Sequence, residues 1–413
     1  MRKTLAMTVV ALSVFGVTAM SAAAEDTVKI GYIDPLSGGG ASIGEGGLKT
    51  FQYLADELNA KGGILGHKVE IVPFDNKVNP QESLIQAQKA IDAGIRYITQ
   101  GNGSSVAAAL TDFVAKNNTR NPGKELLYFN YAAVDPSLTN EKCSFWHFRW
   151  DANSDVKMEA LTNYMKGIPS IKKVYLINQD YSFGQSVRAE ARKMLAAKRP
   201  DIQIVGDELH PLLKVTDFSP YIAKIKASGA DTVVTGNWGQ DIALLLKAAA
   251  DAGLKVNWYT YYAGGAGGPT AIKQANLDHQ VFQVTEGIPN AGYKPAMDFE
   301  KAFRAKVGMS LWYPRAVNEM RMFKLAAEKA KSLDPVKVAS ALEGMKFDVL
   351  DGGEGFMRKE DHQFFQPIYI SSFGNLTAKE PFDEEKTGWG WHLVSKIDTP
   401  QTMLPTTCQM KRP

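Results

Sequence analysis

The sequence predicts an α/β protein made of two doubly wound units, each a parallel sheet with helices on both faces. Short β-branched runs alternate with longer amphipathic stretches, and this alternation restarts after Asp151. The chain has 413 residues, more than the usual 100–200 or so of one domain, which favours two lobes. Hydrophobic residues make up 45% and charged residues 22%, which is typical of a globular chain.

The first unit begins with the β-branched run Val28–Ile33, which predicts a strand. The stretch Ile43–Ala60 predicts a helix because Phe51, Leu54 and Leu58 recur on one face. The same reasoning, applied along the first unit, gives strands Val28–Ile33, Val69–Phe74, Ile95–Thr99 and Leu126–Asn130 and helices Ile43–Ala60, Pro80–Ala93 and Ser104–Lys116.

The second unit repeats this alternation and is followed by three further helical stretches. After Gly352-Gly353 the pattern changes to short strands and a polar tail. The expected strands are Lys173–Ile177, Gln203–Val205, Asp231–Thr235 and Val256–Tyr261, and the expected helices are Asp155–Met165, Gln185–Ala197, Pro220–Ala227, Asp241–Ala252, Ala296–Val307, Val317–Ala330 and Val336–Leu342.

The N-terminus has the pattern of a secretory signal peptide, residues 1–24. Arg2 and Lys3 precede an uncharged, mostly apolar stretch that ends in the small residues Ala22-Ala23-Ala24. A membrane anchor is the alternative, but Leu5–Met20 is short for a bilayer span of about 20 residues. No Cys near the cleavage site could carry a lipid, so we expect a free protein in a Gram-negative periplasm.

The charge balance and the two cysteines also bear on the surroundings of the protein. The formal net charge is +3, and removal of Arg2 and Lys3 leaves 45 basic against 44 acidic residues, which gives no support for nucleic acid or an anionic membrane as partner.

Two cysteines in an exported chain predict one disulfide, Cys143–Cys408, that ties the C-terminal tail to the body. Two buried free thiols are the alternative.

A search for catalytic motifs finds none. Gly38-Gly39-Gly40 fits neither a dinucleotide fingerprint nor a phosphate-binding loop and is interpreted as a strand-to-helix loop. The six His have no metal-ligand partner at i+3 or i+4, and Glu384-Glu385 is interpreted as solvated surface. We therefore expect a protein that is not an enzyme and that has no cofactor and no metal site.

The loops after the predicted strands hold the candidate binding residues, because open α/β sheets bind ligands at the carboxyl ends of their strands. Gly101-Asn102-Gly103-Ser104-Ser105 follows a strand and opens a helix, so its N–H groups and hydroxyls suit a carboxylate; a simple N-cap is the alternative. In the second unit, aromatic residues gather in these loops and predict an aromatic-walled cleft between the lobes.

These segments together resemble the leucine/isoleucine/valine-binding protein family, the type I periplasmic receptors of branched-chain amino acid ABC transporters. The similarity runs from the first strand to about Phe373. It is carried by IGYIDPLSGGGASIGEGGLKTFQYLADELNAKGGILGHKVEIVPFDN, GNGSS, AAVDPSLT, NQDYSFGQSV and VTGNW.

The resemblance implies two interleaved Rossmann-like lobes joined by a three-strand hinge. Crossings between the lobes are expected near Trp150, near Glu286 and near Gly352-Gly353. Lobe one would comprise residues 25–149 and 287–350, and lobe two residues 150–285 and 355–413, with the C-terminal tail.

The resemblance also carries over ligand contacts one residue at a time. Ser104 matches a serine that binds the ligand carboxylate, and Ala132 matches a carbonyl that accepts from the ligand ammonium. A threonine that contacts both groups is replaced by Val134. The family's acidic anchor for the ammonium falls near Tyr262, and no Asp or Glu lies between residues 257 and 276. The full set of expected ligand-binding residues is Asn102, Ser104, Ala132, Val134, Tyr181, Phe183, Trp238 and Tyr262.

The departures from the family pattern favour a ligand that keeps a carboxylate and lacks an α-ammonium, such as an aromatic or other organic acid, because a desolvated ammonium needs a charged or strong acceptor. A branched-chain amino acid held by an acidic group from elsewhere is the alternative.

We expect a monomer that closes around its ligand and hands it to ABC transporter permeases. A periplasmic sensor and an exported enzyme are competing functions.

Overall fold

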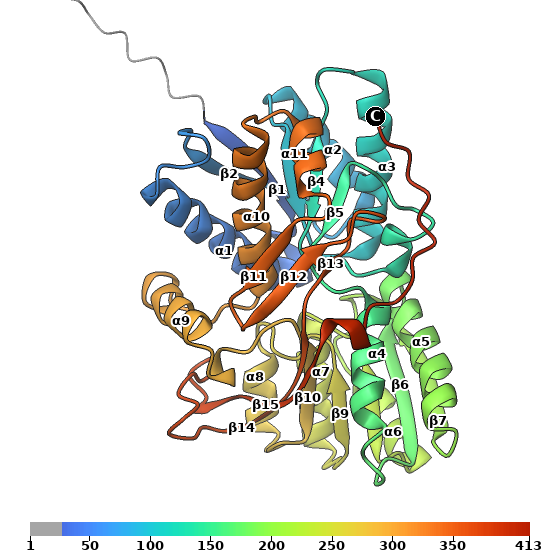
Figure 1. The fold of residues 1–413 in the computed structure, drawn as a ribbon. Helices are drawn as coiled ribbons and strands as arrows, with labels where there is room; N and C mark the ends of the chain where they lie inside the picture. Colours follow the sequence, from blue (N-terminus) through green and yellow to red (C-terminus); the bar gives the residue numbers. More distant parts are fainter. Residues whose placement is uncertain (1–26) are drawn as a thin grey trace, which may run out of the picture.

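The computed structural model describes residues 27–413, which form two α/β lobes with a cavity between them (Figure 1). The predicted signal peptide, residues 1–24, lies outside the described residues. Within the described part, no helix combines the length and the apolar character needed to cross a membrane.

Lobe one contains a five-stranded parallel sheet covered on both faces. Helices α2 and α3 pack on one face, and α1, α10 and α11 pack on the other. In sheet order the strands are β2 (Val69–Asp75), β1 (Val28–Asp34), β3 (Tyr97–Gln100), β4 (Leu127–Asn130) and β5 (His147–Arg149). The helices are α1 (Ala41–Ala60), α2 (Pro80–Asp92), α3 (Ser104–Arg120), α10 (Pro314–Ala330) and α11 (Pro335–Leu342).

Lobe two contains a seven-stranded sheet. Its five strands β6–β10 run parallel to one another. Strand β14 runs antiparallel to both β10 and β15. In sheet order the strands are β15 (Trp389–Ile397), β14 (Ile368–Asn375), β10 (Val281–Thr285), β9 (Asn257–Thr260), β8 (Thr232–Thr235), β6 (Lys173–Gln179) and β7 (Gln203–His210). The helices are α4 (Ser154–Met165), α5 (Ser182–Lys198), α6 (Ser219–Ser228), α7 (Gln240–Asp251) and α8 (Gly268–Gln274).

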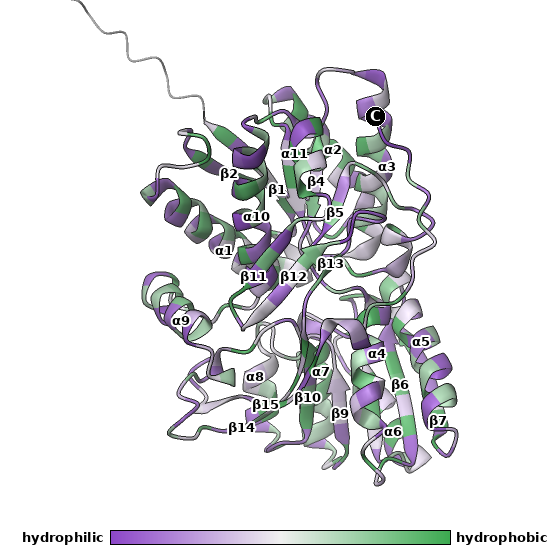
Figure 2. Cartoon of the chain, viewed as in Figure 1, coloured by the Kyte–Doolittle hydropathy of each residue, from purple (hydrophilic) through white to green (hydrophobic). Residues whose placement is uncertain are grey.

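The helices are amphipathic, which explains why they lie on the sheets. In Figure 2, α1, α5 and α10 each alternate between hydrophobic and hydrophilic segments along their length. In α1 the apolar side chains of Phe51, Leu54 and Leu58 are at most 4% exposed and belong to the core of lobe one. Burial of such side chains contributes roughly 25 cal/mol for each Å² of apolar surface removed from water.

The predicted strands and helices are present, with ends that differ by a few residues, and four elements before Gly352 were missed: β5, α8, β10 and β11 (Lys346–Val349). Strand β5 has only three residues, and α8 begins Gly-Pro, so neither gives a periodic pattern. Strand β10 has the sequence VFQVT and lies in the middle of the second sheet. Its apolar residues are too few to distinguish it from a loop by periodicity alone.

The chain passes between the lobes after β5 and after β10, and then a third time at residues 366–367. The expected third passage near Gly352-Gly353 is instead the turn of a hairpin. There β11 (Lys346–Val349) pairs with β12 (Gly353–Met357), and β12 pairs with β13 (Phe364–Phe365). A bridge between Arg149 and Gln363 holds this small sheet beside β5.

The end of the tail lies along lobe one, although the expected boundary placed all of residues 355–413 with lobe two. The predicted disulfide between Cys143 and Cys408 is present and ties the end of the tail to lobe one. Thr406 Oγ1 donates to Thr139 O at 2.8 Å, and Arg412 Nε donates to Glu343 Oε1 at 2.8 Å. The tail therefore runs back from lobe two across to lobe one.

Removal of this disulfide is expected to lower the free energy of unfolding by about 2–5 kcal/mol, because the bond constrains the unfolded chain. The measurement is guanidinium unfolding of Cys143→Ser/Cys408→Ser beside the wild type, with reduced wild type as the control that should match the variant. Thiol titration of the denatured, unreduced protein should find no free thiol. Two free thiols, or an unchanged unfolding midpoint, would contradict the prediction.

Candidate ligand-binding site

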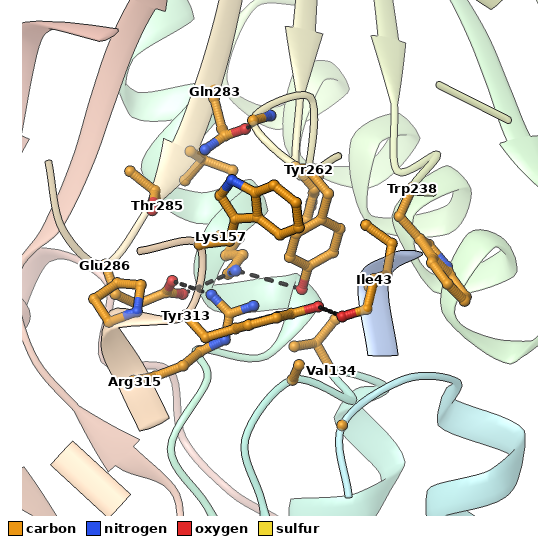
Figure 3. Close-up of a pocket in the computed structure, with 18 of the residues that line it drawn as sticks. Ile43, Val134, Lys157, Trp238, Tyr262, Gln283, Thr285, Glu286, Tyr313 and Arg315 are labelled. Atoms are coloured by element: carbon orange, nitrogen blue, oxygen red, sulfur yellow. Dashed lines mark hydrogen bonds and ion pairs between the residues drawn. The ribbon is translucent and has the colours of Figure 1, made fainter. Parts of the chain in front are cut away.

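A cavity lies between the lobes, at the carboxyl ends of the parallel strands (Figure 3). The two lobes close around it: a Cβ placed on Gly239 of lobe two would lie 3.8 Å from Ile43 Cγ1 of lobe one. The structure brings all eight expected residues to this one cavity: Asn102, Ser104, Ala132, Val134, Tyr181, Phe183, Trp238 and Tyr262.

The N-terminus of α3 faces the cavity from lobe one. Gly103 precedes the helix with φ of +98°, a conformation that favours glycine, and turns the chain from β3 into α3. The first helical bond runs from Ala107 N to Gly103 O, so the N–H groups of Ser104, Ser105 and Val106 have no partner within the helix. Ser104 Oγ accepts from Asp135 N at 3.2 Å, which leaves its proton free to donate. This helix end suits an anion.

The loop that holds Ser104 rests on the buried carboxylate of Asp34. Asp34 accepts from the N–H groups of Gly101 and Asn102 and from the hydroxyl of Tyr131. Burial is the largest influence on Asp34 and raises its pKa to about 6, although these hydrogen bonds oppose the shift. The side chain of Asn102 donates to Tyr131 Oη at 3.0 Å, so it supports the loop as well as lining the cavity.

The loop after β4 contributes backbone groups and an apolar side chain. Val134 is 1% exposed, and its carbonyl accepts from Ser154 N of lobe two at 2.9 Å. This bond joins the two lobes beside the cavity. Ala132 N donates to the side chain of Asn130 at 3.2 Å, which fixes the turn of the loop.

Aromatic side chains form the wall of lobe two. The ring centroid of Phe183 lies 5.9 Å from that of Tyr181 and 5.9 Å from that of Tyr262. Trp238 Nε1 donates to Tyr181 Oη at 2.7 Å, which locks both rings in place. Figure 3 shows Trp238 and Tyr262 extending from their strands towards the cavity. Rigid rings of this kind offer a large contact area at low entropic cost.

Four buried charged side chains, which we call the charged quartet, lie against this wall: Asp151, Lys157, Glu286 and Arg315. Lys157 Nζ lies 2.7 Å from Asp151 Oδ1 and 2.8 Å from Glu286 Oε1. Arg315 Nε lies 3.0 Å from Asp151 Oδ2, and Arg315 Nη1 lies 3.3 Å from Glu286 Oε2. All four carboxylate oxygens are therefore paired with a cation. Figure 3 shows Glu286 beside Lys157 and Arg315.

The surroundings of the quartet shift the pKa values of its acids in opposite directions. Burial, together with the charge of Glu286, raises the pKa of Asp151. Burial also acts to raise the pKa of Glu286, but the Lys157 ammonium and the Arg315 guanidinium outweigh it and lower that pKa. Tyr262 Oη donates to Asp151 Oδ2 at 3.1 Å, so the tyrosine joins the quartet to the cavity.

The sequence reasoning did not find the quartet or the far end of the cavity. Lys157 and Arg315 stand in amphipathic helices, where a charge is usually solvated, and only the crossings near Trp150 and Glu286 pointed to this place. The interpretation of Glu384 as solvated surface is wrong, because Glu384 is 6% exposed and lines the cavity. Other lining residues that were missed are Ile43, Gln283, Ser371, Trp312, Tyr313 and Trp391.

Comparisons with known proteins agree with this architecture. A family model described as periplasmic binding protein matches residues 27–375. A Brucella abortus protein named Leu/Ile/Val-binding protein homolog 4 is 33% identical to this chain over 416 aligned positions, which cover 98% of this chain and 96% of that protein.

Solved structures are similar as well. The leucine-, isoleucine-, valine-, threonine- and alanine-binding protein from Brucella ovis, in a closed conformation, gives a TM-score of 0.82 at 31% identity over 94% of this chain and 100% of that chain. A solute-binding protein of an ABC transporter from Rhodopseudomonas palustris, in complex with 3,4-dihydroxybenzoic acid, gives a TM-score of 0.75 at 19% identity over 91% of this chain and 98% of that chain. The similarity to the Rhodopseudomonas palustris protein, at 19% identity, shows a shared fold only.

Loss of one cation from the quartet should be strongly destabilising, because two acids are left buried with half of their pairing. We expect Lys157→Met to lower the free energy of unfolding by about 3–5 kcal/mol. The measurement is urea unfolding, and Asp151→Asn added to Lys157→Met should restore part of the loss.

The matched control for this variant is Lys247→Met. Lys247 Nζ lies 2.6 Å from Asp251 Oδ2, but both side chains are more than half exposed. An exposed ion pair contributes little, so no measurable change is expected. Equal losses in the free energy of unfolding for the two substitutions would show that the quartet contributes no more to stability than an exposed ion pair.

Proposed function

The chain belongs to the periplasmic binding protein family, and on that premise we propose that it captures a small organic carboxylate without an α-ammonium, aromatic acids included, and delivers it to an ABC transporter. The observation that carries this proposal is the combination of a free helix N-terminus at Ser104 with acids that are already paired. The cavity offers donors to an anion, and both acids among its described lining residues, Glu286 and Glu384, already have a cation beside them.

The energetics favour this ligand class over an amino acid. The carboxylate of the ligand would accept from the N–H and hydroxyl groups of Ser104, which costs no rearrangement of the loop. An ammonium would have to compete with Lys157 and Arg315 for Asp151 and Glu286, and burying it unpaired costs several kcal/mol. The rings of Phe183 and Trp238 would cover the apolar body of the ligand.

Closure of the two lobes is the proposed mechanism of capture. The ligand would first bind the loops of lobe one, and lobe two would then bring Trp238 and Tyr262 over it. A ligand that contacts both lobes stabilises the closed form over the open form and so shifts the population. We propose that the permeases recognise this closed form and that no chemical step occurs.

Binding of a branched-chain amino acid is the second candidate. The names of the relatives at 33% and 31% identity favour it, and so does the presence of Glu286 in the lining of the cavity. A sensing role would use the same ligand site. Neighbouring genes for permeases and ATPases would favour transport over sensing.

Leucine and 4-methylpentanoate test the two ligand classes, because they differ only in the α-ammonium. We expect 4-methylpentanoate to bind at least about tenfold more tightly, since the ammonium of leucine finds no free acid. Isothermal titration calorimetry of protein that has been unfolded and refolded to remove bound ligand measures both affinities. Tighter binding of leucine would overturn the carboxylate proposal and support the amino-acid alternative.

Substitutions in the two walls should weaken binding of a carboxylate such as benzoate or 4-methylpentanoate. We expect Trp238→Ala to weaken binding about thirtyfold, or about 2 kcal/mol, and Ser104→Ala to weaken it about tenfold. Trp146→Ala, which lies in lobe one outside the cavity lining, is the control and should bind normally. An affinity unchanged by Trp238→Ala would remove that ring from the site.

A further inference from the structure

We infer that the cavity contains a second polar subsite, formed by the amide N–H of Gln283 and the indole N–H of Trp391, that binds an uncharged acceptor oxygen at the far end of the ligand. The inference rests on the proposed carboxylate function and specifies its ligand further. The ligand would be an elongated carboxylate whose other end carries a carbonyl, amide or hydroxyl oxygen.

The position of Gln283 defines the subsite. Gln283 lies on β10 in the second sheet, and Figure 3 shows it at the end of the cavity opposite Val134, with Tyr262 and Lys157 between them. Trp391 reaches the cavity from β15, where its ring packs on Phe373 at a centroid distance of 4.9 Å. The subsite is therefore separate from the carboxylate site at α3.

The orientation of the Gln283 amide is fixed by the protein. Its Oε1 accepts from the N–H of Gly264, which fixes which end of the amide carries the donor Nε2. Among residues 27–413, neither Gln283 Nε2 nor Trp391 Nε1 has a hydrogen-bond partner, although both side chains line the cavity. Two donors without acceptors at the inner surface of a cavity call for an acceptor on the ligand.

The two donors converge on one place. A Cβ built on Gly264 would lie 3.0 Å from Gln283 Nε2 and 3.1 Å from Trp391 Nε1. A side chain at this position would press on both nitrogens and on Gln283 Oε1, so glycine lets the two side chains approach each other. The two nitrogens are therefore at most about 6 Å apart, and one ligand oxygen between them on the cavity side could accept from both donors.

The charge at this end of the cavity favours a neutral acceptor. Glu384 also lines the cavity, and burial raises its pKa to about 8 despite the Arg304 guanidinium beside it, so its carboxyl is mostly protonated at neutral pH. Ser371 Oγ donates to Gln283 O at 3.4 Å and adds no acceptor aimed at the ligand. The cations Lys157 and Arg315 are engaged in the charged quartet, so a second carboxylate would find no free counter-ion here.

Two isosteric ligand pairs test the subsite. Within each pair, one molecule carries a carbonyl where the other carries a branched carbon: 4-acetylbenzoate against 4-isopropylbenzoate, and 5-oxohexanoate against 5-methylhexanoate. We expect wild-type protein to prefer the carbonyl ligand by about tenfold in at least one pair, as measured by calorimetry. Trp391→Phe and Gln283→Met should each reduce that preference without weakening the branched ligand.

Trp389→Phe is the matched control, because Trp389 lies on the same strand and does not line the cavity. It should keep the wild-type preference. Binding of both members of a pair without preference, or a preference that survives Trp391→Phe and Gln283→Met, would overturn the subsite and leave the carboxylate function intact. Failure of all four carboxylates to bind would overturn both.

Discussion

The charged quartet is the interaction on which the arrangement of the cavity depends. Asp151 and Glu286 stand at two of the passages between the lobes, Lys157 belongs to α4 of lobe two, and Arg315 belongs to α10 of lobe one. The quartet thus joins both lobes and two connections at one buried point. Buried ion pairs contribute little net stability compared with apolar packing, but they penalise any arrangement that separates the partners. The quartet therefore fixes how the lobes meet more than how stably each lobe folds.

The quartet also decides what the cavity can bind. A set of two acids and two cations, each paired twice, presents almost no net charge to a ligand. Tyr262, at the place where the family's acidic anchor would fall, donates to Asp151 and so faces the cavity as part of this closed set. Outside this set, the cavity has donors at both ends: the N-terminus of α3 at one end and the Gln283 amide at the other.

The sequence was sufficient for the parts of the structure that depend on local pattern. The strand–helix alternation gave both lobes, and the loops after β3, β4, β6, β8 and β9 held all eight expected cavity residues, because sheet topology fixes where those loops meet. The quartet could not be predicted in the same way, since Lys157 and Arg315 are separated by 158 sequence positions and each looks like an ordinary surface charge of a helix. Only tertiary packing brings them together.

The far end of the cavity was missed for a related reason, and that reason explains its chemistry. Gln283 lies between half-buried Phe282 and buried Val284 on a short central strand, β10, which gave no periodic signal. Trp391 and Glu384 come from the last strand and the loop before it, where the polar composition suggested surface. A polar side chain on a central strand must find a partner or face a cavity, because an unpaired buried amide costs free energy. Gln283 does both: its oxygen is paired with Gly264, and its N–H group is left for the ligand.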